Sequence, residues 1–307
     1  MHRAIAAIDG GGTKTAAVIA RRDGKVHELP NALGCNPQDG TDWKSALGSI
    51  LAQIPKDALL VLGMPGYGEV PSIDAHVTRF VAERFGPNCH ILNDVELAFH
   101  GAFPKGDGVL VLCGTGSMAV GGRQGRIVRS GGWGYVIGDE GSAYWIGQQA
   151  LAYAAAEIDG RAPDVQFASR LSDALDAPNH PFGLLEWVAA SPAPRAQVAE
   201  VARAVDQLDT KGDAIARSIL DGAALHLVAL AQSVAERSKA TAPYKWCSAG
   251  SVFQSNRIAA MVQQKLGPQS QPAMSTLGGG LMLASAMAEW SVDAEWSASI
   301  AAQLDQS

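Results

Sequence analysis

Two short turns in the sequence combine glycine with hydroxyl side chains, a combination suited to binding phosphate. The first, DGGGTKT at Asp9–Thr15, lies between the apolar runs Arg3–Ile8 and Ala16–Ala20. Glycine can adopt positive φ and lets a ligand approach its backbone N–H group closely. Threonine hydroxyls add further donors. The residues expected to bind phosphate in this turn are Gly11, Gly12, Thr13, Lys14 and Thr15.

The second turn, GTGS at Gly114–Ser117, lies between the apolar runs Val109–Cys113 and Met118–Gly121. Both turns therefore read as strand, tight turn and strand. Two such turns facing each other would hold a polyphosphate from both sides, which predicts a nucleotide-dependent phosphotransferase built on a duplicated domain. An ordinary structural hairpin is the alternative at each place. The expected phosphate-binding residues here are Thr115, Gly116 and Ser117.

Two better-known phosphate motifs do not fit the first turn. Gly10 and Gly12 resemble the start of a dinucleotide fingerprint, but that fingerprint requires a helix directly after the glycines. The residues that follow, Thr15–Ala20, have the composition of a strand. The P-loop pattern GxxxxGK[ST] does not occur in the sequence.

Two aspartates stand at expected strand ends. Asp9 ends the first strand beside the glycines, and because a carboxylate does not bind phosphate directly, its expected role is to support Mg²⁺ through water. The alternative for Asp9 is to accept hydrogen bonds from the turn amides. Asp94 follows the apolar segment His90–Asn93 and precedes a helix, where a helix N-cap is the plain interpretation.

The composition favours a soluble cytoplasmic protein of about two domains. Of the 307 residues, 47% are apolar and 18% charged, and the net charge of −6 argues against a nucleic-acid partner. No apolar stretch is expected to span a membrane, and the N-terminal apolar run is too short for a signal peptide. The cysteines Cys35, Cys89, Cys113 and Cys247 are far apart, which suggests neither a disulfide framework nor a zinc site.

The elements that position these residues alternate between strands and helices in the first third of the chain. Further strands are expected at Val26–Leu29, Ala58–Gly63, His90–Asn93, Arg126–Arg129 and Trp246–Ala249. Helices are expected at Asp42–Gln53, Ser72–Phe85 (capped by Ser72), Asp94–His100, Gly141–Glu157, Val165–Leu175, Gln197–Gln207, Asp213–Lys239, Asn256–Lys265, Leu281–Glu289 and Val292–Leu304. The glycine-rich segment Pro104–Gly108 is a candidate hinge.

An ordered set of motifs resembles one known family. The motifs are DGGGTKT at Asp9–Thr15, NDVELA at Asn93–Ala98, GTGS at Gly114–Ser117, GGWG at Gly131–Gly134, GDEGSAYWIG at Gly138–Gly147, AGSV at Ala249–Val252 and GGG at Gly278–Gly280. Together they resemble the N-acetylglucosamine kinase and glucosamine kinase group of the BadF/BadG/BcrA/BcrD ATPase family. That family is part of the superfamily of actin-like ATPases, sugar kinases and heat-shock chaperones.

This resemblance implies an α/β fold of two ribonuclease-H-like lobes with ATP in the cleft between them. The first lobe would comprise residues 1–107 and 287–307, and the second residues 108–286. The implied activity is magnesium- and ATP-dependent phosphorylation of the primary hydroxyl of N-acetylglucosamine or glucosamine. Family analogy also implies a homodimer.

The resemblance also implies roles for individual residues. Asp94 matches the catalytic base and would contact the sugar. The other residues that would bind the sugar are Asn36, Thr115, Gly131, Gly132 and Asp139. The residues that would lie at the adenosine side are Gly212, Gly250 and Ser251.

Two details of the sugar side stay open at this stage. Trp133 is either a stacking platform for the sugar or, more in keeping with a GGWG turn, a packing anchor. Pro37 and Gln38 stand where the animal enzymes of this group have a tryptophan-containing segment, which leaves free glucosamine open as the substrate.

Two other functions compete with a sugar kinase. An activator ATPase of the same family would carry an iron–sulfur cluster, which needs clustered thiolates, and the cysteines here are dispersed. A non-catalytic sugar sensor would have no need to keep Asp94, Asp9 and both glycine turns.

Overall fold

The computed structural model describes residues 2–38 and 42–304. The chain divides into two compact units, with Met1–Asp107 and Gln271–Ser307 in unit 1 and Gly108–Ser270 in unit 2. The first boundary falls in the glycine-rich segment singled out as a hinge. The return to unit 1 comes at Gln271 rather than at residue 287, because the helix Thr276–Met287 packs on the first strand and on the helix Asp94–Ala102.

Unit 1 is a mixed sheet with helices on both faces. Its strands are β1 (Ala4–Gly10), β2 (Lys14–Arg21), β3 (Val26–Glu28), β4 (Ala32–Leu33), β5 (Leu59–Met64) and β6 (Cys89–Asn93). Its helices are α1 (Trp43–Leu51), α2 (Pro71–Arg84), α3 (Asp94–Ala102), α10 (Thr276–Met287) and α11 (Ala294–Leu304). The strand order is β3-β2-β1-β5-β6, with β4 paired to β2.

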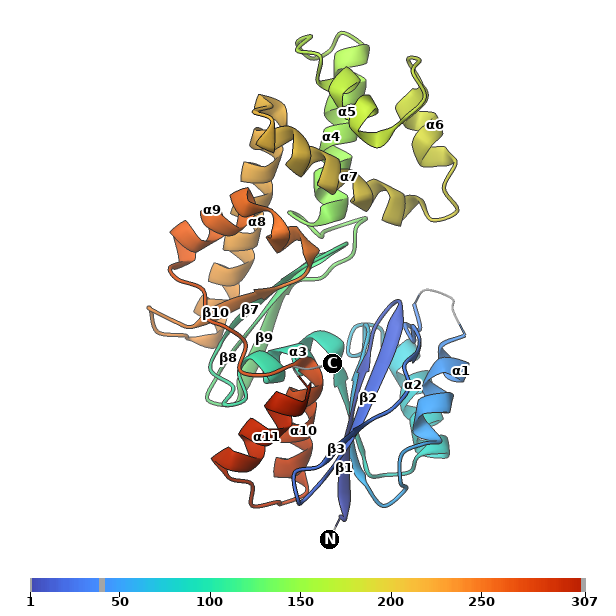
Figure 1. Cartoon of the computed structure of the whole chain (residues 1–307), viewed down its shortest axis with the longest axis vertical. Helices are drawn as coiled ribbons and strands as arrows, with labels where there is room; N and C mark the ends of the chain where they lie inside the picture. The colour runs from blue at the N-terminus through green and yellow to red at the C-terminus, as the bar shows by residue number, and fades with distance from the viewer. Residues whose placement is uncertain (1, 39–41, 305–307) are drawn as a thin grey trace. The chain divides into compact units, whose positions relative to one another are not determined.

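Alternating side chains of β1 build two separate cores in unit 1. Ala6 and Ile8 pack with α1 and α2, whereas Ile5 and Ala7 pack with α10 and α11. This alternation follows from the two-residue period of a strand, which sends successive side chains to opposite faces. Figure 1 shows the two helix pairs on opposite sides of the sheet.

Unit 2 contains a smaller sheet and most of the helices. Its strands are β7 (Gly108–Cys113), β8 (Ser117–Arg123), β9 (Arg126–Gly131) and β10 (Trp246–Ala249), in the order β10-β7-β8-β9. Its helices are α4 (Ala143–Ile158), α5 (Phe167–Leu175), α6 (Gly183–Ala189), α7 (Pro194–Thr210), α8 (Ala214–Ser238), the short 3₁₀ helix η1 (Ser251–Gln254) and α9 (Asn256–Leu266).

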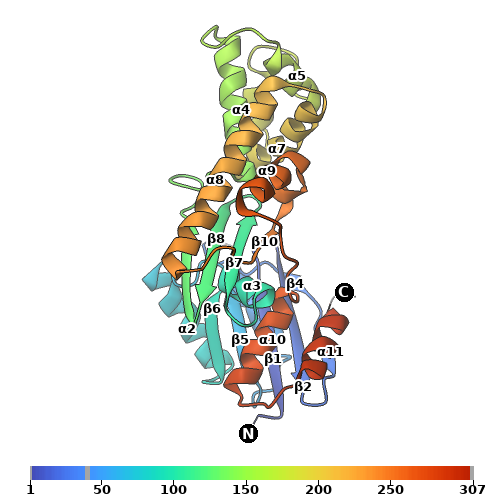
Figure 2. The ribbon, with the colours of Figure 1, turned by 90° about the vertical axis from the view of Figure 1, so that its left-hand side faces the viewer.

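The long helix α8 forms the spine of unit 2. It runs along the sheet (Figure 2) and packs on β7, β8 and β9. By length and hydropathy alone α8 could cross a membrane, contrary to the expectation from the sequence, but its buried side chains, such as Leu220, Leu227 and Val234, belong to the core of unit 2.

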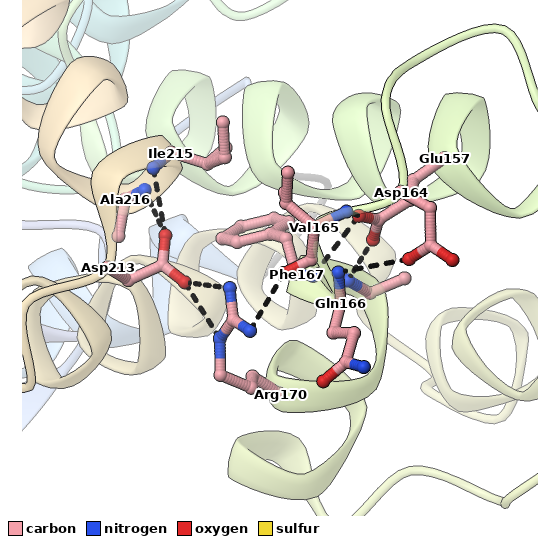
Figure 3. A network of polar contacts seen from close by, with 10 residues as sticks. Glu157, Asp164, Val165, Gln166, Phe167, Arg170, Asp213, Ile215 and Ala216 are labelled. Carbon is pink, nitrogen blue, oxygen red and sulfur yellow. Dashed lines mark hydrogen bonds and ion pairs between the residues drawn. The ribbon is translucent and has the colours of Figure 1, made fainter.

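Two carboxylates tie the helices of unit 2 together (Figure 3). Glu157, at the end of α4, accepts hydrogen bonds from the backbone N–H groups of Val165, Phe167 and Ala168 at 2.6, 3.3 and 2.6 Å. It therefore serves the unpaired donors at the start of α5.

Asp213 caps the next long helix in a similar way. It accepts from the N–H groups of Ile215 and Ala216, both at 2.9 Å, and pairs with Arg170 of α5 at 2.5 Å. These contacts fix the start of α8 against α5.

The structure differs from the expected elements in a few places. The side chain of Ser72 does not cap α2, because Pro71 occupies the first turn and Val70 stands at the cap position. The three glycines Gly278–Gly280 lie inside α10 instead of preceding it. They let α10 approach α3 closely, since a Cβ on Gly279 would lie 2.1 Å from the backbone nitrogen of Gly101.

Candidate active site

The first glycine turn is a β-hairpin between β1 and β2. The two strands pair antiparallel up to Gly10 and Thr15, and Gly11 donates to the carbonyl of Lys14 at 2.9 Å. Gly12, Thr13 and Lys14 are exposed. The turn therefore presents backbone, a hydroxyl and an ammonium group to solvent, as a phosphate-binding hairpin requires.

Thr15 has a different position from the one expected. It is fully buried, and its hydroxyl donates to the carbonyl of Leu33 at 2.8 Å. The hydroxyl thus joins β2 to β4 instead of facing a ligand. The phosphate contacts expected from this turn then fall to Thr13, Lys14 and the backbone.

Asp9 and Asp94 lie at the same edge of the unit 1 sheet. β1 pairs parallel with β5, which pairs parallel with β6, so Asp9 is level with Gly63 and Asn93 with Met64. Asp94 follows directly as the first residue of α3. Ligands of open α/β sheets bind at the carboxyl ends of the strands, and both carboxylates stand there.

The charges at this edge affect each other. The pKa of Asp94 is raised to about 7, mainly by burial; a hydrogen bond from the Val95 amide opposes the rise, and the carboxylates of Asp9 and Glu69 add to it. Burial raises the pKa of Asp9 to about 6, with Lys14 opposing this rise. A carboxyl with a pKa near 7 can act as a general base at neutral pH.

The cap of α3 is Asn93, not Asp94. The side chain of Asn93 accepts from the Val95 amide at 3.0 Å, and Asp94 Oδ1 accepts from the same amide at 2.9 Å. This shared bond orients the Asp94 carboxylate. The helix-cap interpretation of Asp94 is therefore wrong, and its role as a base stays a prediction.

Asn36 lies in a loop bound to the first glycine turn. The neighbouring Cys35 amide donates to the carbonyl of Gly11 at 3.0 Å, and Asn36 Oδ1 accepts from the Gln38 amide at 3.0 Å. A Cβ on Gly34 would lie 2.0 Å from the carbonyl oxygen of Gly12. Only glycine therefore allows this loop to lie against the hairpin.

Sequence reasoning missed a contact beside Asn36. Gln38 donates through Nε2 to the carboxylate of the half-buried Glu69 at 3.4 Å. Glu69 belongs to the loop after β5, which carries no recognisable motif. Burial raises the pKa of Asp94, and the negative charge of Glu69 adds to that rise.

The second glycine turn joins β7 and β8 in unit 2. The start of α4 is bound to it, because the amides of Ala143 and Tyr144 donate to the carbonyls of Gly114 and Thr115 at 2.9 and 3.4 Å. Thr115 is exposed. Ser117 is buried, and its hydroxyl donates to the carbonyl of Glu140 at 2.8 Å. As with Thr15, the inner hydroxyl holds the loop in place.

Gly131 and Gly132 end β9 at positive φ, 76° and 71°. The Gly132 amide donates to the Ser117 carbonyl at 3.0 Å. A Cβ on Gly132 would lie 1.9 Å from the Met118 side chain. The positive φ of both residues favours glycine at this approach of the loop to the second hairpin.

Asp139 lies over the second hairpin. It is 3% exposed, at a φ of 60°. A Cβ on Gly116 would lie 2.8 Å from Asp139 Oδ2. The carboxylate accepts from the Ser117 amide at 3.5 Å and from Arg195 at 3.4 Å. Asp139 does not cap α4, because Ser142 has that role.

Gly250 brings the end of β10 to the second hairpin. Its φ is 106°, and a Cβ there would lie 2.1 Å from the carbonyl oxygen of Cys113. A pocket with a volume of about 320 Å³ lies beside this contact in unit 2, with both Thr115 and Ser251 in its wall. The hairpin and the adenosine motif are thus parts of one pocket.

Helix α7 supplies the polar wall of that pocket, which the sequence did not predict. Four polar side chains of α7 line it: Glu200, Arg203, Asp206 and Gln207. The helical period alone does not show which face of α7 meets a ligand, since packing decides it. Gly212, at a φ of 89° between α7 and α8, does not line the pocket.

Trp133 is 67% exposed, so the interpretation as a packing anchor is wrong. It belongs to an apolar loop whose other exposed side chains are Tyr135, Val136 and Ile137.

The carboxylate of Asp9 fits a cation whose remaining ligands are water and the phosphates of a nucleotide. Across residues 2–38 and 42–304, no three His, Cys, Asp or Glu side chains are grouped so that they could hold a metal ion. A single carboxylate such as Asp9 suits Mg²⁺ that keeps several waters and is held by nucleotide phosphates, and the cation would offset the cost of burying its charge. The four cysteines are free, and three of them are buried.

Comparison with known proteins identifies the family. The profile of the BadF/BadG/BcrA/BcrD ATPase family matches residues 7–275. The chain belongs to this ATPase family. The resemblance inferred from the motifs is therefore confirmed.

Similar proteins have been described as sugar kinases. A relative from Clostridium acetobutylicum named N-acetylmuramic acid/N-acetylglucosamine kinase is 29% identical over 242 residues, 75% of this chain and 78% of the relative. A candidate N-acetylglucosamine kinase from Chromobacterium violaceum has a TM-score of 0.72 at 22% identity, over 92% of this chain and 99% of its own.

A second solved structure agrees with the first. The candidate N-acetylglucosamine kinase of Porphyromonas gingivalis has a TM-score of 0.64 at 19% identity, over 92% of this chain and 98% of its own. These likenesses confirm the expected α/β fold with two sheet-containing lobes.

Proposed function

We propose that the chain is an ATP-dependent kinase that phosphorylates the primary hydroxyl of an amino sugar, N-acetylglucosamine or glucosamine. The observation that carries the proposal is the position of Asp94. Its carboxylate stands at the strand edge that also holds Asp9 and the first glycine turn, with a pKa of about 7. The similarity to proteins named as N-acetylglucosamine kinases supports the same reaction class.

In this reaction the sugar hydroxyl oxygen forms a bond to the γ-phosphorus of ATP. The bond from that phosphorus to the bridging oxygen breaks, and ADP leaves. Asp94 accepts the hydroxyl proton. Phosphoryl transfer depends mostly on positioning and on charge neutralisation, and general-base help contributes on the order of 10²–10⁴ in rate.

The other residues bind and orient the two substrates. Thr13, Lys14, Thr115 and the turn backbones would contact the phosphates, and the pocket beside Ser251 would hold the nucleoside. ATP would arrive with Mg²⁺, which supplies charge neutralisation when bound, and Asp9 would contact that ion through water.

The residues proposed to bind the sugar are those that the family resemblance indicates. In unit 1 they are Asn36 and Asp94. In unit 2 they are Gly131, Gly132 and Asp139. Asp139 is suited to this role because an ionised carboxylate accepts strongly from hydroxyl groups.

ATP consumption in the presence of glucosamine, N-acetylglucosamine, N-acetylmuramic acid or glucose tests the proposal. We expect turnover that depends on one of the amino sugars and a phosphorylated product. Equal turnover with every sugar and with none would favour an activator ATPase. Tight sugar binding without turnover would favour a sensor.

A further inference from the structure

The Asp139 carboxylate has weak contacts for a buried charge. The Ser117 amide and Arg195 donate to it over long bonds of 3.5 and 3.4 Å, and the Gly134 amide also donates to it. A carboxylate has about four acceptor sites, and leaving a buried charge short of partners is costly. Asp139 therefore retains capacity for a hydrogen-bond donor that comes from outside the protein.

Glu157 of the same unit shows what a purely structural carboxylate looks like. It is 8% exposed, and three backbone amides donate to it, two of them at 2.6 Å. Asp139 is more deeply buried, at 3% exposed, and its bonds to the Ser117 amide and to Arg195 are longer. It also keeps a left-handed φ of 60°, a conformation that costs energy in a residue other than glycine and that clusters at binding sites.

Arg195 is the cation that faces this carboxylate. It lies in the first turn of α7, and its guanidinium is placed 4.9 Å above the ring of Tyr135. Stacking on an aromatic ring fixes the plane of a guanidinium, and the N–H groups in that plane can still donate hydrogen bonds. The side chain is 42% exposed, so the pair borders solvent and is accessible to a ligand.

We propose that Arg195 is a positioning residue for the acceptor sugar, because its guanidinium pairs with the Asp139 carboxylate and orients it to accept hydrogen bonds from sugar hydroxyls. This inference rests on the proposed function, in which Asp139 binds the sugar. It adds a residue of α7 that belongs to none of the sequence motifs.

The electrostatic surroundings of Asp139 are consistent with this role. Burial raises the pKa of Asp139 overall; the Ser117 amide, Arg195 and the Gly134 amide lower it in that order, and Glu140 raises it. Burial raises the pKa of the Cys113 thiol on β7, and the Asp139 carboxylate adds to that rise. Arg195 is thus the cation that opposes the cost of burying Asp139.

The test compares Arg195→Met and Arg195→Lys with the wild-type chain, at saturating ATP and varied sugar. We expect Arg195→Met to raise the KM for the sugar at least tenfold, with kcat and the KM for ATP within about threefold of wild type. Arg195→Lys keeps the charge and should recover part of the loss. The acid limb of kcat/KM for the sugar should move to higher pH in Arg195→Met, because Asp139 then protonates more easily.

A second set of variants combines Arg195→Met with Asp139→Asn. If Arg195 acts through Asp139, Arg195→Met added to Asp139→Asn should cause little further loss. Arg161→Met is the matched control, since Arg161 forms an exposed pair with Asp159 in the same unit, and it should change no kinetic constant. Melting temperatures of all variants separate misfolding from loss of sugar binding.

The outcomes separate the two proposals. An active wild-type kinase whose sugar KM and pH profile are unaffected by Arg195→Met, or whose two substitutions add independently, overturns the role of Arg195 alone. A folded wild-type chain without sugar-dependent turnover overturns the proposed function, and with it the role of Arg195.

Discussion

Burial raises the pKa of Asp94, and the carboxylate of Asp9 adds to the rise, although 85 positions of sequence separate the two residues. They are brought together because β1, β5 and β6 run parallel and end at one edge. Glu69 adds a third negative charge that acts on Asp94. This edge therefore favours a protonated Asp94 below neutral pH and a basic Asp94 above it.

The first prediction concerns pH. Because the pKa of Asp94 is raised to about 7, kcat/KM should rise with pH through an acid limb near that value. Glu69→Gln removes one neighbouring negative charge, so the limb should move to lower pH. Initial rates of ATP consumption between pH 5 and 9 measure this. A limb that stays in place, or moves upward, would contradict the assigned coupling.

The second prediction compares two glycines. Gly250→Ala places a Cβ 2.1 Å from a backbone carbonyl at a φ of 106°, so we expect it to cost about 2–4 kcal/mol of unfolding free energy and to raise the KM for ATP. Gly212→Ala has a φ of 89° with no atom within 4 Å, and backbone strain alone should cost about 1 kcal/mol.

Urea unfolding and ATP titration of both glycine variants provide the measurement. Equal losses of unfolding free energy in the two variants would mean that the close approach of Gly250 to Cys113 contributes little to stability.

The third prediction concerns the pocket of unit 2. Ala196 is exposed and lines that pocket, so Ala196→Trp should fill part of it without disturbing a core. We expect the KM for ATP to rise about tenfold, equivalent to a binding loss of about 1.4 kcal/mol. Ala193→Trp, also exposed on the preceding turn but outside the pocket wall, is the control. Unchanged ATP affinity in Ala196→Trp would place the nucleoside elsewhere.

The fourth prediction concerns stability. Burial raises the pKa of Glu157, but the amides of Ala168, Val165 and Phe167 outweigh this and lower it overall. A lowered carboxyl pKa contributes stability that is present above the unfolded-state value and is lost as pH falls through the folded-state value. Glu157→Gln should therefore cost about 2 kcal/mol at pH 7 and much less near pH 3.

Denaturant unfolding at the two pH values measures this cost. Glu186→Gln, on an exposed side chain paired with His180, is the control. A pH-independent loss in Glu157→Gln would point to packing instead of charge.

The sequence predicted the parts of the site that depend on local pattern. The glycine hairpins, the position of Asp94 at a strand end and the turn at Gly250 all follow from residue type and spacing. It could not predict the direction of the hydroxyls of Thr15 and Ser117, which face inward because strand pairing places them on the buried side.

The sequence also did not predict the residues that tertiary packing brings to the site. Arg195 and Asp206 lie on α7, and Glu69 lies in a loop without a motif. The short helix α6 was missed because seven residues give too little periodicity. The chain return at Gln271 depends on how α10 packs on β1, which the glycines of that helix do not reveal by themselves.

The most direct test of the account is the rate of sugar-dependent ATP turnover in Asp94→Asn, measured beside the wild-type chain with the amino sugar that the wild type uses. Asparagine keeps the size of the side chain and an acceptor for the Val95 amide, so the variant should fold and bind both substrates. The account predicts a kcat at least about 100-fold lower. Turnover near the wild-type rate would show that Asp94 is not the base.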